Sequence, residues 1–193
     1  MATFDAVYLR VEKVPDDSFF EDLSKKTRIF NVLTFGDPII ARWTEGMPWI
    51  QIQGVDDPDS SQLGQRLSQQ YMTDSIVFCV QTVVDAFAYW HFRNGRELRC
   101  LIFGCKKEGC WETARGEPDD WEDAILFNQE DFNRYYKDDG SERFKEARKI
   151  FEGKKIVLGK SYPRFSVLEI GQRLGLPGFD YSKPWSIECE LPR

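Results

Sequence analysis

Two tryptophan–glutamate steps form the most suggestive chemical pattern in this 193-residue chain. Trp111-Glu112 and Trp121-Glu122 flank an acidic stretch that contains Glu117. Two carboxylates and two indoles around one pocket would suit a cation or a sugar, through ring contacts and acid chemistry. The other interpretation is that the tryptophans pack against a sheet while the acidic side chains face water.

Asp85 is a second unusual acid, because apolar residues surround it in the chain. A buried carboxylate needs a partner, and Arg96, Arg99 or a backbone amide at a break in the strand could serve. A structural role and a catalytic role both stay open. Together with Glu112 and Glu122, Asp85 would give a carboxylate-dependent hydrolase or transferase.

The chain has one histidine, His91. Any Ser-His-Asp or Cys-His arrangement would have to use it. We expect His91 to be a half-exposed strand residue near a hairpin tip, which argues against histidine-based catalysis. The sequence also lacks the Gly-x-Ser-x-Gly nucleophile motif and the two glycine-rich phosphate-binding motifs.

The five cysteines are odd in number, which favours reduced thiols in a cytoplasmic protein. Three of them are evenly spaced, at Cys100, Cys105 and Cys110, but zinc sites need paired ligands at shorter spacing. We therefore predict no metal and no cofactor. No secretory signal and no transmembrane segment is recognisable in the sequence.

Composition and charge limit the classes of partner that the chain is expected to bind. The hydrophobic fraction of 41% and the charged fraction of 30% are typical of a globular domain. The net charge of −6 argues against nucleic acid and anionic membranes as partners. The charge is uneven: residues 112–131 carry eight acids and one base, whereas residues 134–155 carry eight bases and five acids.

The order of elements in the first half is strand, helix, strand, strand, helix, strand. This order predicts an α+β fold with a ferredoxin-like, split βαβ sheet that is mainly antiparallel, with helices on one face. The strands include residues 49–53, while residues 29–35 and 39–43 could form another. The run from residue 75 to 92 is either one long strand or two strands broken near residues 82–85.

Asn94-Gly95 predicts a tight β-hairpin that extends this sheet. In a two-residue loop, Trp90 would face Arg99 and form a cation–π contact. The same register pairs His91 with Leu98 and Phe92 with Glu97.

We expect the sheet domain to span residues 1–136 and a more helical extension, residues 137–193, to pack on the same domain. Residues 142–151 and 166–174 have helical patterns, and residues 155–158 and 187–191 are short candidate strands. The acidic stretch 116–123 is expected to be a loop.

Residues 60–125 resemble a pattern in uncharacterised bacterial proteins of unknown function. The pattern is Val-Asp-x-Phe at 84–87, the hairpin with Arg-x-Leu at 99–101, Gly-Glu-Pro at 116–118 and the two Trp-Glu steps. The resemblance implies no activity, substrate or catalytic residue.

The sequence favours a non-enzymatic binding protein, similar to immunity or partner-binding proteins. Its partner would be a basic protein or a small ligand, and acidic binders gain association rate by electrostatic steering. A homo-oligomer is a further alternative. The expected binding residues are Asp85, Arg99, Trp111, Glu112, Glu117, Trp121 and Glu122.

Overall fold

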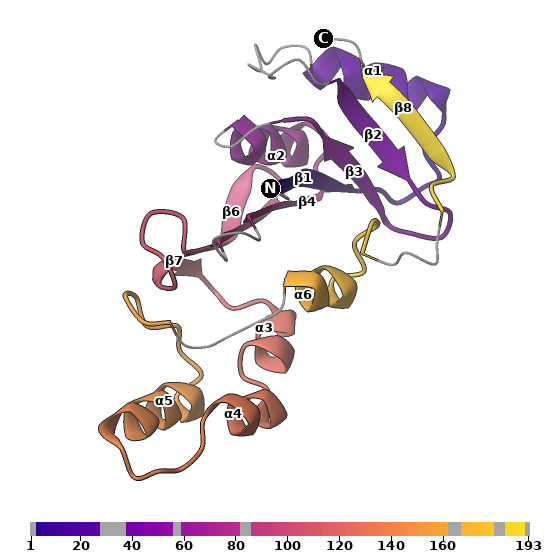
Figure 1. Cartoon of the computed structure of the whole chain (residues 1–193). Coiled ribbons are helices and arrows are strands. Elements are labelled where there is room, and N and C mark those ends of the chain that lie inside the picture. Colours follow the sequence, from indigo (N-terminus) through magenta and orange to yellow (C-terminus); the bar gives the residue numbers. More distant parts are fainter. Residues whose placement is uncertain are drawn as a thin grey trace.

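The computed structural model describes residues 3–27, 38–55, 59–81, 86–161, 167–179 and 184–191. They form an α+β fold around one antiparallel sheet of eight strands, in the order β7-β6-β5-β4-β1-β3-β2-β8 (Figure 1). The strands are β1 (Thr3–Arg10), β2 (Ile39–Trp43), β3 (Trp49–Gln53), β4 (Asp74–Gln81), β5 (Ala86–Arg93), β6 (Arg96–Phe103), β7 (Trp111–Gly116) and β8 (Ile187–Leu191).

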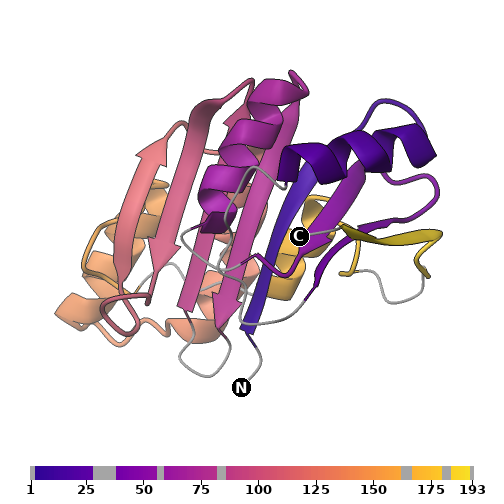
Figure 2. The same ribbon diagram turned by 90° about the horizontal axis from the view of Figure 1, so that it is seen from above.

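Helices cover both faces of the sheet (Figures 1 and 2). One face carries α1 and α2, and the other carries the helices that follow β7. The expectation of helices on one face is therefore wrong. The described helices are α1 (Asp17–Thr27), α2 (Asp59–Gln70), α3 (Asp120–Ile125), α4 (Gln129–Tyr135), α5 (Glu142–Glu152) and α6 (Val167–Arg173).

The central strands require this second layer because they are apolar on both sides. In β1, the neighbouring residues Val7 and Tyr8 point to opposite faces, and both are fully buried. Val7 packs in a core with Leu63 and Leu67, which lie one turn apart on α2. Tyr8 belongs to a separate core with Trp121 of α3.

The element order of the first half is as expected. β1 lies between β4 and β3, and β3 pairs on its other side with β2, with all of these neighbours antiparallel. The long apolar run is two strands, β4 and β5, which pair with each other. The candidate strand at residues 29–35 and the break at residues 82–85, including Asp85, lie outside the described residues.

The hairpin between β5 and β6 turns at Asn94 and Gly95 as predicted. Both residues have the positive φ angles that a tight turn of this kind needs, +52° and +81°. Phe92 faces Glu97, which is the predicted pair.

Beyond that pair, the predicted register is wrong. A β-bulge leaves Leu98 of β6 without a paired residue in β5. As a result, His91 faces Arg99 and Trp90 faces Cys100. The predicted contacts between Trp90 and Arg99 and between His91 and Leu98 therefore do not form. Because the extra residue shifts β6 by one position, the Arg99 side chain comes to the same face as His91.

The C-terminal part is a mixture of helices and strand. Helices α5 and α6 and strand β8 agree with the sequence prediction, and β8 pairs with β2 at one end of the sheet. Residues 155–158 are not a strand. The next two residues, Gly159 and Lys160, bond to the backbone of Trp111 in β7. The Trp111 N–H donates to the Lys160 carbonyl (3.0 Å), and the Gly159 N–H donates to the Trp111 carbonyl (2.8 Å).

The acidic stretch after β7 is not only a loop, because α3 begins within it and α4 follows. Every helix in the described ranges is too short or too polar to cross a membrane.

Candidate functional site

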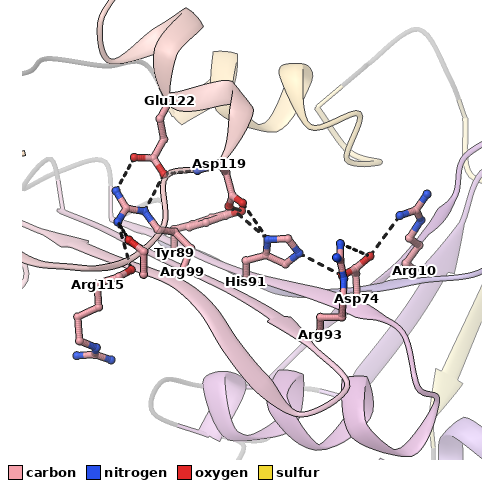
Figure 3. Close-up of polar contacts among 10 residues, drawn as sticks. Arg10, Asp74, Tyr89, His91, Arg93, Arg99, Arg115, Asp119 and Glu122 are labelled. Atoms are coloured by element: carbon pink, nitrogen blue, oxygen red, sulfur yellow. Dashed lines mark hydrogen bonds and ion pairs between the residues drawn. The ribbon is translucent and has the colours of Figure 1, made fainter. Parts of the chain in front are cut away.

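A chain of charged side chains lies between the sheet and α3, and we call it the charged cluster (Figure 3). The sheet supplies its basic groups and Asp74, and the start of α3 supplies the other two acids. Figure 3 shows the dashed contacts running from Glu122 at one end to Arg10 at the other. The cluster consists of Arg10, Asp74, Tyr89, His91, Arg93, Arg99, Asp119 and Glu122.

His91 lies at the centre of the charged cluster, between two carboxylates. Its Nδ1 is 3.1 Å from Asp119 Oδ1, and its Nε2 is 3.3 Å from Asp74 Oδ1. The His91 side chain is 14% exposed and that of Asp74 is 9% exposed, so both groups lie at the edge of the core. His91 is therefore a bridging residue between β4 and α3.

The surroundings of His91 favour its charged form. Burial alone would lower the pKa of His91, but the hydrogen bonds and negative charges of Asp119 and Asp74 outweigh burial and raise the pKa. The same contacts act on the acids. Burial would raise the pKa of Asp119, but hydrogen bonds from His91 and Tyr89 lower it below its ordinary value.

Asp74 is held by two arginines on the other side of His91. Arg93 Nε donates to Asp74 Oδ1 (2.6 Å) and Arg10 Nη1 donates to Asp74 Oδ2 (3.2 Å). Burial would raise the pKa of Asp74, but Arg93, His91 and Arg10 together lower it. Asp74 therefore shares its charge among three cationic groups.

Arg99 and Glu122 form the buried end of the charged cluster. Arg99 Nε donates to Glu122 Oε1 (2.7 Å), and Arg99 Nη2 donates to Glu122 Oε2 (2.5 Å). Arg99 Nη1 also donates to the backbone carbonyls of Arg115 and Gly116. Burial raises the pKa of Glu122 although Arg99 opposes this shift. This pair fixes α3 against β6 and β7.

Tyr89 joins the charged cluster to the apolar core. Its hydroxyl donates to Asp119 Oδ2 (2.6 Å), and its ring meets Trp121 edge-on, with the ring centres 5.4 Å apart. Burial, followed by the charge of Asp119, raises the pKa of Tyr89 well above its usual range. Tyr89 therefore acts as a permanent hydrogen-bond donor to Asp119.

The local sequence explains why α3 begins where it does. Asp119 is the N-cap residue of α3, in an extended conformation, and Glu122 is the third helical residue. The Asp119 N–H donates to the Glu122 carboxylate (2.9 Å), which is the acidic half of a capping box. The pattern Asp-x-x-Glu at 119–122 was the signal that could have predicted both this helix and the place of Asp119.

The predicted tryptophans are core residues. Trp111 is 1% exposed and Trp121 is 3% exposed, so neither indole is available at the surface. Trp111 packs against Phe103, with the ring centres 5.1 Å apart. The tryptophan side chains therefore do not line a binding surface, and packing against the sheet is their role here.

The predicted carboxylates that the structure describes, Glu112, Glu117 and Glu122, do not converge. The Glu112 carboxylate accepts hydrogen bonds from the backbone N–H groups of Lys106 and Lys107, in the turn before β7. The Glu122 carboxylate is buried with Arg99, whereas Glu117 is exposed. The structure thus brings Arg99 and Glu122 together and leaves Glu112 and Glu117 elsewhere.

Two open grooves occur in the described part of the chain. One, of about 670 Å³, lies between the segment after β1 and the turn before β4, and the other, of about 450 Å³, lies between α4 and α5. Glu112, Glu117 and Glu122 line neither groove.

The charged cluster is better suited to holding elements together than to catalysis. Within the described ranges, both ring nitrogens of His91 contact carboxylates, so neither faces a nucleophile. Asp74 and Asp119 lie on opposite edges of the imidazole and cannot share one ion. Across the same ranges, no group of three or more His, Cys, Asp or Glu side chains is arranged to hold a metal.

Sequence reasoning missed Asp74, Tyr89, Asp119 and the bridging place of His91. Comparisons with protein families, with curated proteins and with solved structures found no match for this chain.

Proposed function

We propose that this protein is a non-enzymatic binding protein that recognises a basic protein partner through an acidic surface at α3 and α4. The observation that carries this proposal is the contrast between anchored and free acids in residues 117–131. Glu122 and Asp119 are tied to the sheet, whereas Glu117, Asp120 and Glu130 are exposed. We call these three exposed residues the acidic surface.

The acidic surface lies on and beside α3, which is held to the sheet, but its carboxylates have no cationic partner among the described residues. Its three carboxylates make no ion pair with any of the described residues, whereas nearby Asp123 pairs with Lys154 (2.7 Å). An exposed carboxylate without a partner ordinarily serves to keep a protein soluble. Three such acids before, on and after a helix that is held by a buried ion pair favour a partner that supplies lysine or arginine side chains.

The separation of Glu112 and Glu122, the two candidate catalytic carboxylates that the structure describes, also supports binding over hydrolysis. A carboxylate enzyme needs two acids that share one pocket, at a separation set by its mechanism. Glu112 and Glu122 are each engaged by different groups, at opposite ends of β7. A small-molecule ligand for the acidic surface remains an outcome of the test below.

The test is affinity capture from the source cell with three versions of the chain. The first is wild type. The second carries Glu117→Lys, Asp120→Lys and Glu130→Lys. The third is a control with Glu12→Lys, Asp17→Lys and Glu21→Lys, which reverses three exposed acids on the opposite layer and changes the net charge equally.

We expect a basic protein that is retained by wild type and by the control but lost with the acidic-surface variant. With purified proteins, its affinity should fall as salt rises, because the exposed charges are screened. A partner that is retained equally by all three chains, or lost equally with both variants, would show that the acidic surface does not recognise it. Hydrolytic turnover by wild type that Glu112→Gln abolishes would favour the enzyme instead.

We also propose that the N-terminal half has the split βαβ topology of ferredoxin-like sheets. The order β4-β1-β3-β2 supports this, with α1 between β1 and β2 and α2 between β3 and β4. On this proposal, β5 to β7 extend the basic unit on one side and β8 extends it on the other.

A further inference from the structure

The His91 ring is the only described side chain that bridges the sheet and the start of α3 through a group that titrates near neutral pH. Asp74 Oδ1 lies on its Nε2 side and Asp119 Oδ1 lies on its Nδ1 side, as Figure 3 shows. An imidazolium has two N–H donors and can satisfy both carboxylates. A neutral imidazole has one donor and one lone pair, so one carboxylate would face a lone pair.

Loss of one proton weakens the contact between His91 and Asp119 in either tautomer of the neutral ring, because that contact no longer involves a positive charge. Asp74 keeps Arg93 and Arg10 when His91 loses a proton. Asp119 keeps only the Tyr89 hydroxyl among the described side chains. If the remaining proton stays on Nδ1, the hydrogen bond to Asp119 persists without the charge of the imidazolium; if it stays on Nε2, Asp119 faces a lone pair.

The groups that face His91 from every neighbouring element are few. β4 contributes Asp74, the N-cap of α3 contributes Asp119, and β5 itself contributes Tyr89 and Arg93. From β6, Arg99 lies directly across the strand pair, and its charge is balanced by Glu122. From β1, Arg10 reaches only the far oxygen of Asp74.

We propose that His91 is a pH-sensitive clamp, which holds the start of α3 on the sheet while its ring carries two protons and loosens that contact when one proton leaves. This clamp is a property of the fold and does not depend on the binding partner proposed above. The sign follows from linkage: His91 binds its proton more tightly in the folded state. Its contribution is therefore complete below the unfolded-state pKa of histidine, as long as Asp74 and Asp119 stay ionised, and is lost as the pH rises through the folded pKa.

The first measurement is an NMR titration of the His91 ring nitrogens in the full-length, ¹⁵N-labelled chain. Because the chain has one histidine, the two ring signals need no assignment. We expect both nitrogens to show the imidazolium signature below the midpoint, with a midpoint above the ordinary histidine pKa of 6.5. A midpoint at or below 6.5 would overturn the proposal.

The second measurement is amide hydrogen exchange in α3, corrected for intrinsic rates, on either side of that midpoint. We expect protection at the start of α3 to fall by about tenfold or more above the midpoint, as loss of a charge-assisted hydrogen bond predicts. Protection in α2, on the other face of the sheet, should not change. Equal changes in α2 and α3, or no change in α3, would contradict a local clamp.

Two variants separate the clamp from general stability. Asp119→Asn keeps an N-cap residue but removes one negative charge, so it should lower the midpoint of His91. Asp123→Asn, at an exposed position of the same helix, should leave that midpoint unchanged. If Asp119→Asn does not lower the midpoint, Asp119 does not hold the ring and the proposal fails. The wild-type titration decides the matter if the first variant does not fold.

Discussion

Arg99 and Glu122 meet as a two-pronged ion pair in the interior, with side chains that are only 6% and 1% exposed. The guanidinium presents two adjacent N–H groups to the two oxygens of one carboxylate, which is the strongest geometry for such a pair. The pair exists because the bulge at Leu98 turns Arg99 toward α3. A local irregularity in one strand thus determines how the helical layer is attached.

Removing one partner of this pair should be very costly. Glu122→Ala leaves Arg99 charged and buried, and we expect a loss of about 3–5 kcal/mol in the free energy of unfolding. Chemical denaturation followed by tryptophan fluorescence measures it. Asp123→Ala, which removes an exposed ion pair from the same helix, is the control and should cost about 1 kcal/mol or less. Similar losses in the two variants would mean that Arg99 and Glu122 are not buried together.

Two glycines with positive φ should differ sharply in their tolerance of alanine. At Gly116, an added Cβ would lie 1.8 Å from the Leu98 carbonyl oxygen, whereas at Gly109 it would meet nothing within 4 Å. Gly109→Ala should therefore cost about 1–2 kcal/mol, the price of the left-handed conformation alone. Gly116→Ala should cost clearly more and should disturb the hydrogen bond from Arg99 to the Gly116 carbonyl. Equal melting temperatures for the two variants would argue against the close approach of β6 and β7.

The backbone conformation of the hairpin turn can be tested by substitution. Asn94→Val with Gly95→Val places two branched residues at positive φ and should destabilise the protein by at least about 2–4 kcal/mol. A thermal melt of the double variant beside wild type is sufficient. The same two substitutions at exposed strand positions would be nearly neutral, so a wild-type melting temperature would show that the turn is not tight.

Stability in acid should depend on Asp74 and Asp119. The folded-state pKa of each carboxyl is lowered, so the unfolded chain takes up protons first as the pH falls. The stabilisation is complete above the unfolded-state pKa of about 4 and is lost progressively below it. Asp74→Asn or Asp119→Asn should flatten the decline in unfolding free energy between about pH 5 and pH 2 relative to wild type. The raised pKa of Glu122 acts in the opposite sense in wild type and in both variants. An unchanged slope would contradict the contacts of Asp74 with Arg93 and His91, or those of Asp119 with His91 and Tyr89.

Most of the fold could be predicted from local patterns. The strands at 49–53 and 187–191 and the helix that begins at residue 142 have the expected bounds or differ by a residue, because each has a clear period or cap. The second helical layer could not be predicted from alternation. Both Val77 and Phe78 of β4 are fully buried, and a strand that is apolar on both sides does not say what covers it.

The charged cluster was harder to predict for a different reason. A single unpaired residue in β6 reverses the face of every later side chain in that strand, and nothing in the local sequence marks Leu98 as a bulge. Glu122 and Arg99 were both recognised as notable residues, but their pairing required this shift. Asp119 was recognisable as an N-cap, and its contact with His91 required the tertiary fold.

The short contact between Trp111 and the segment at Gly159 and Lys160 has a consequence for solubility. β7 ends one side of the sheet, and such an edge offers unpaired backbone groups to any other extended chain. The two hydrogen bonds with this returning segment, one donated by Trp111 and one by Gly159, occupy the first residue of the edge. The register irregularity at Glu112 distorts the next residue. The segment after α5 thereby leaves less of this edge open to pairing with another chain, and shortening the chain after α5 would expose the backbone of Trp111.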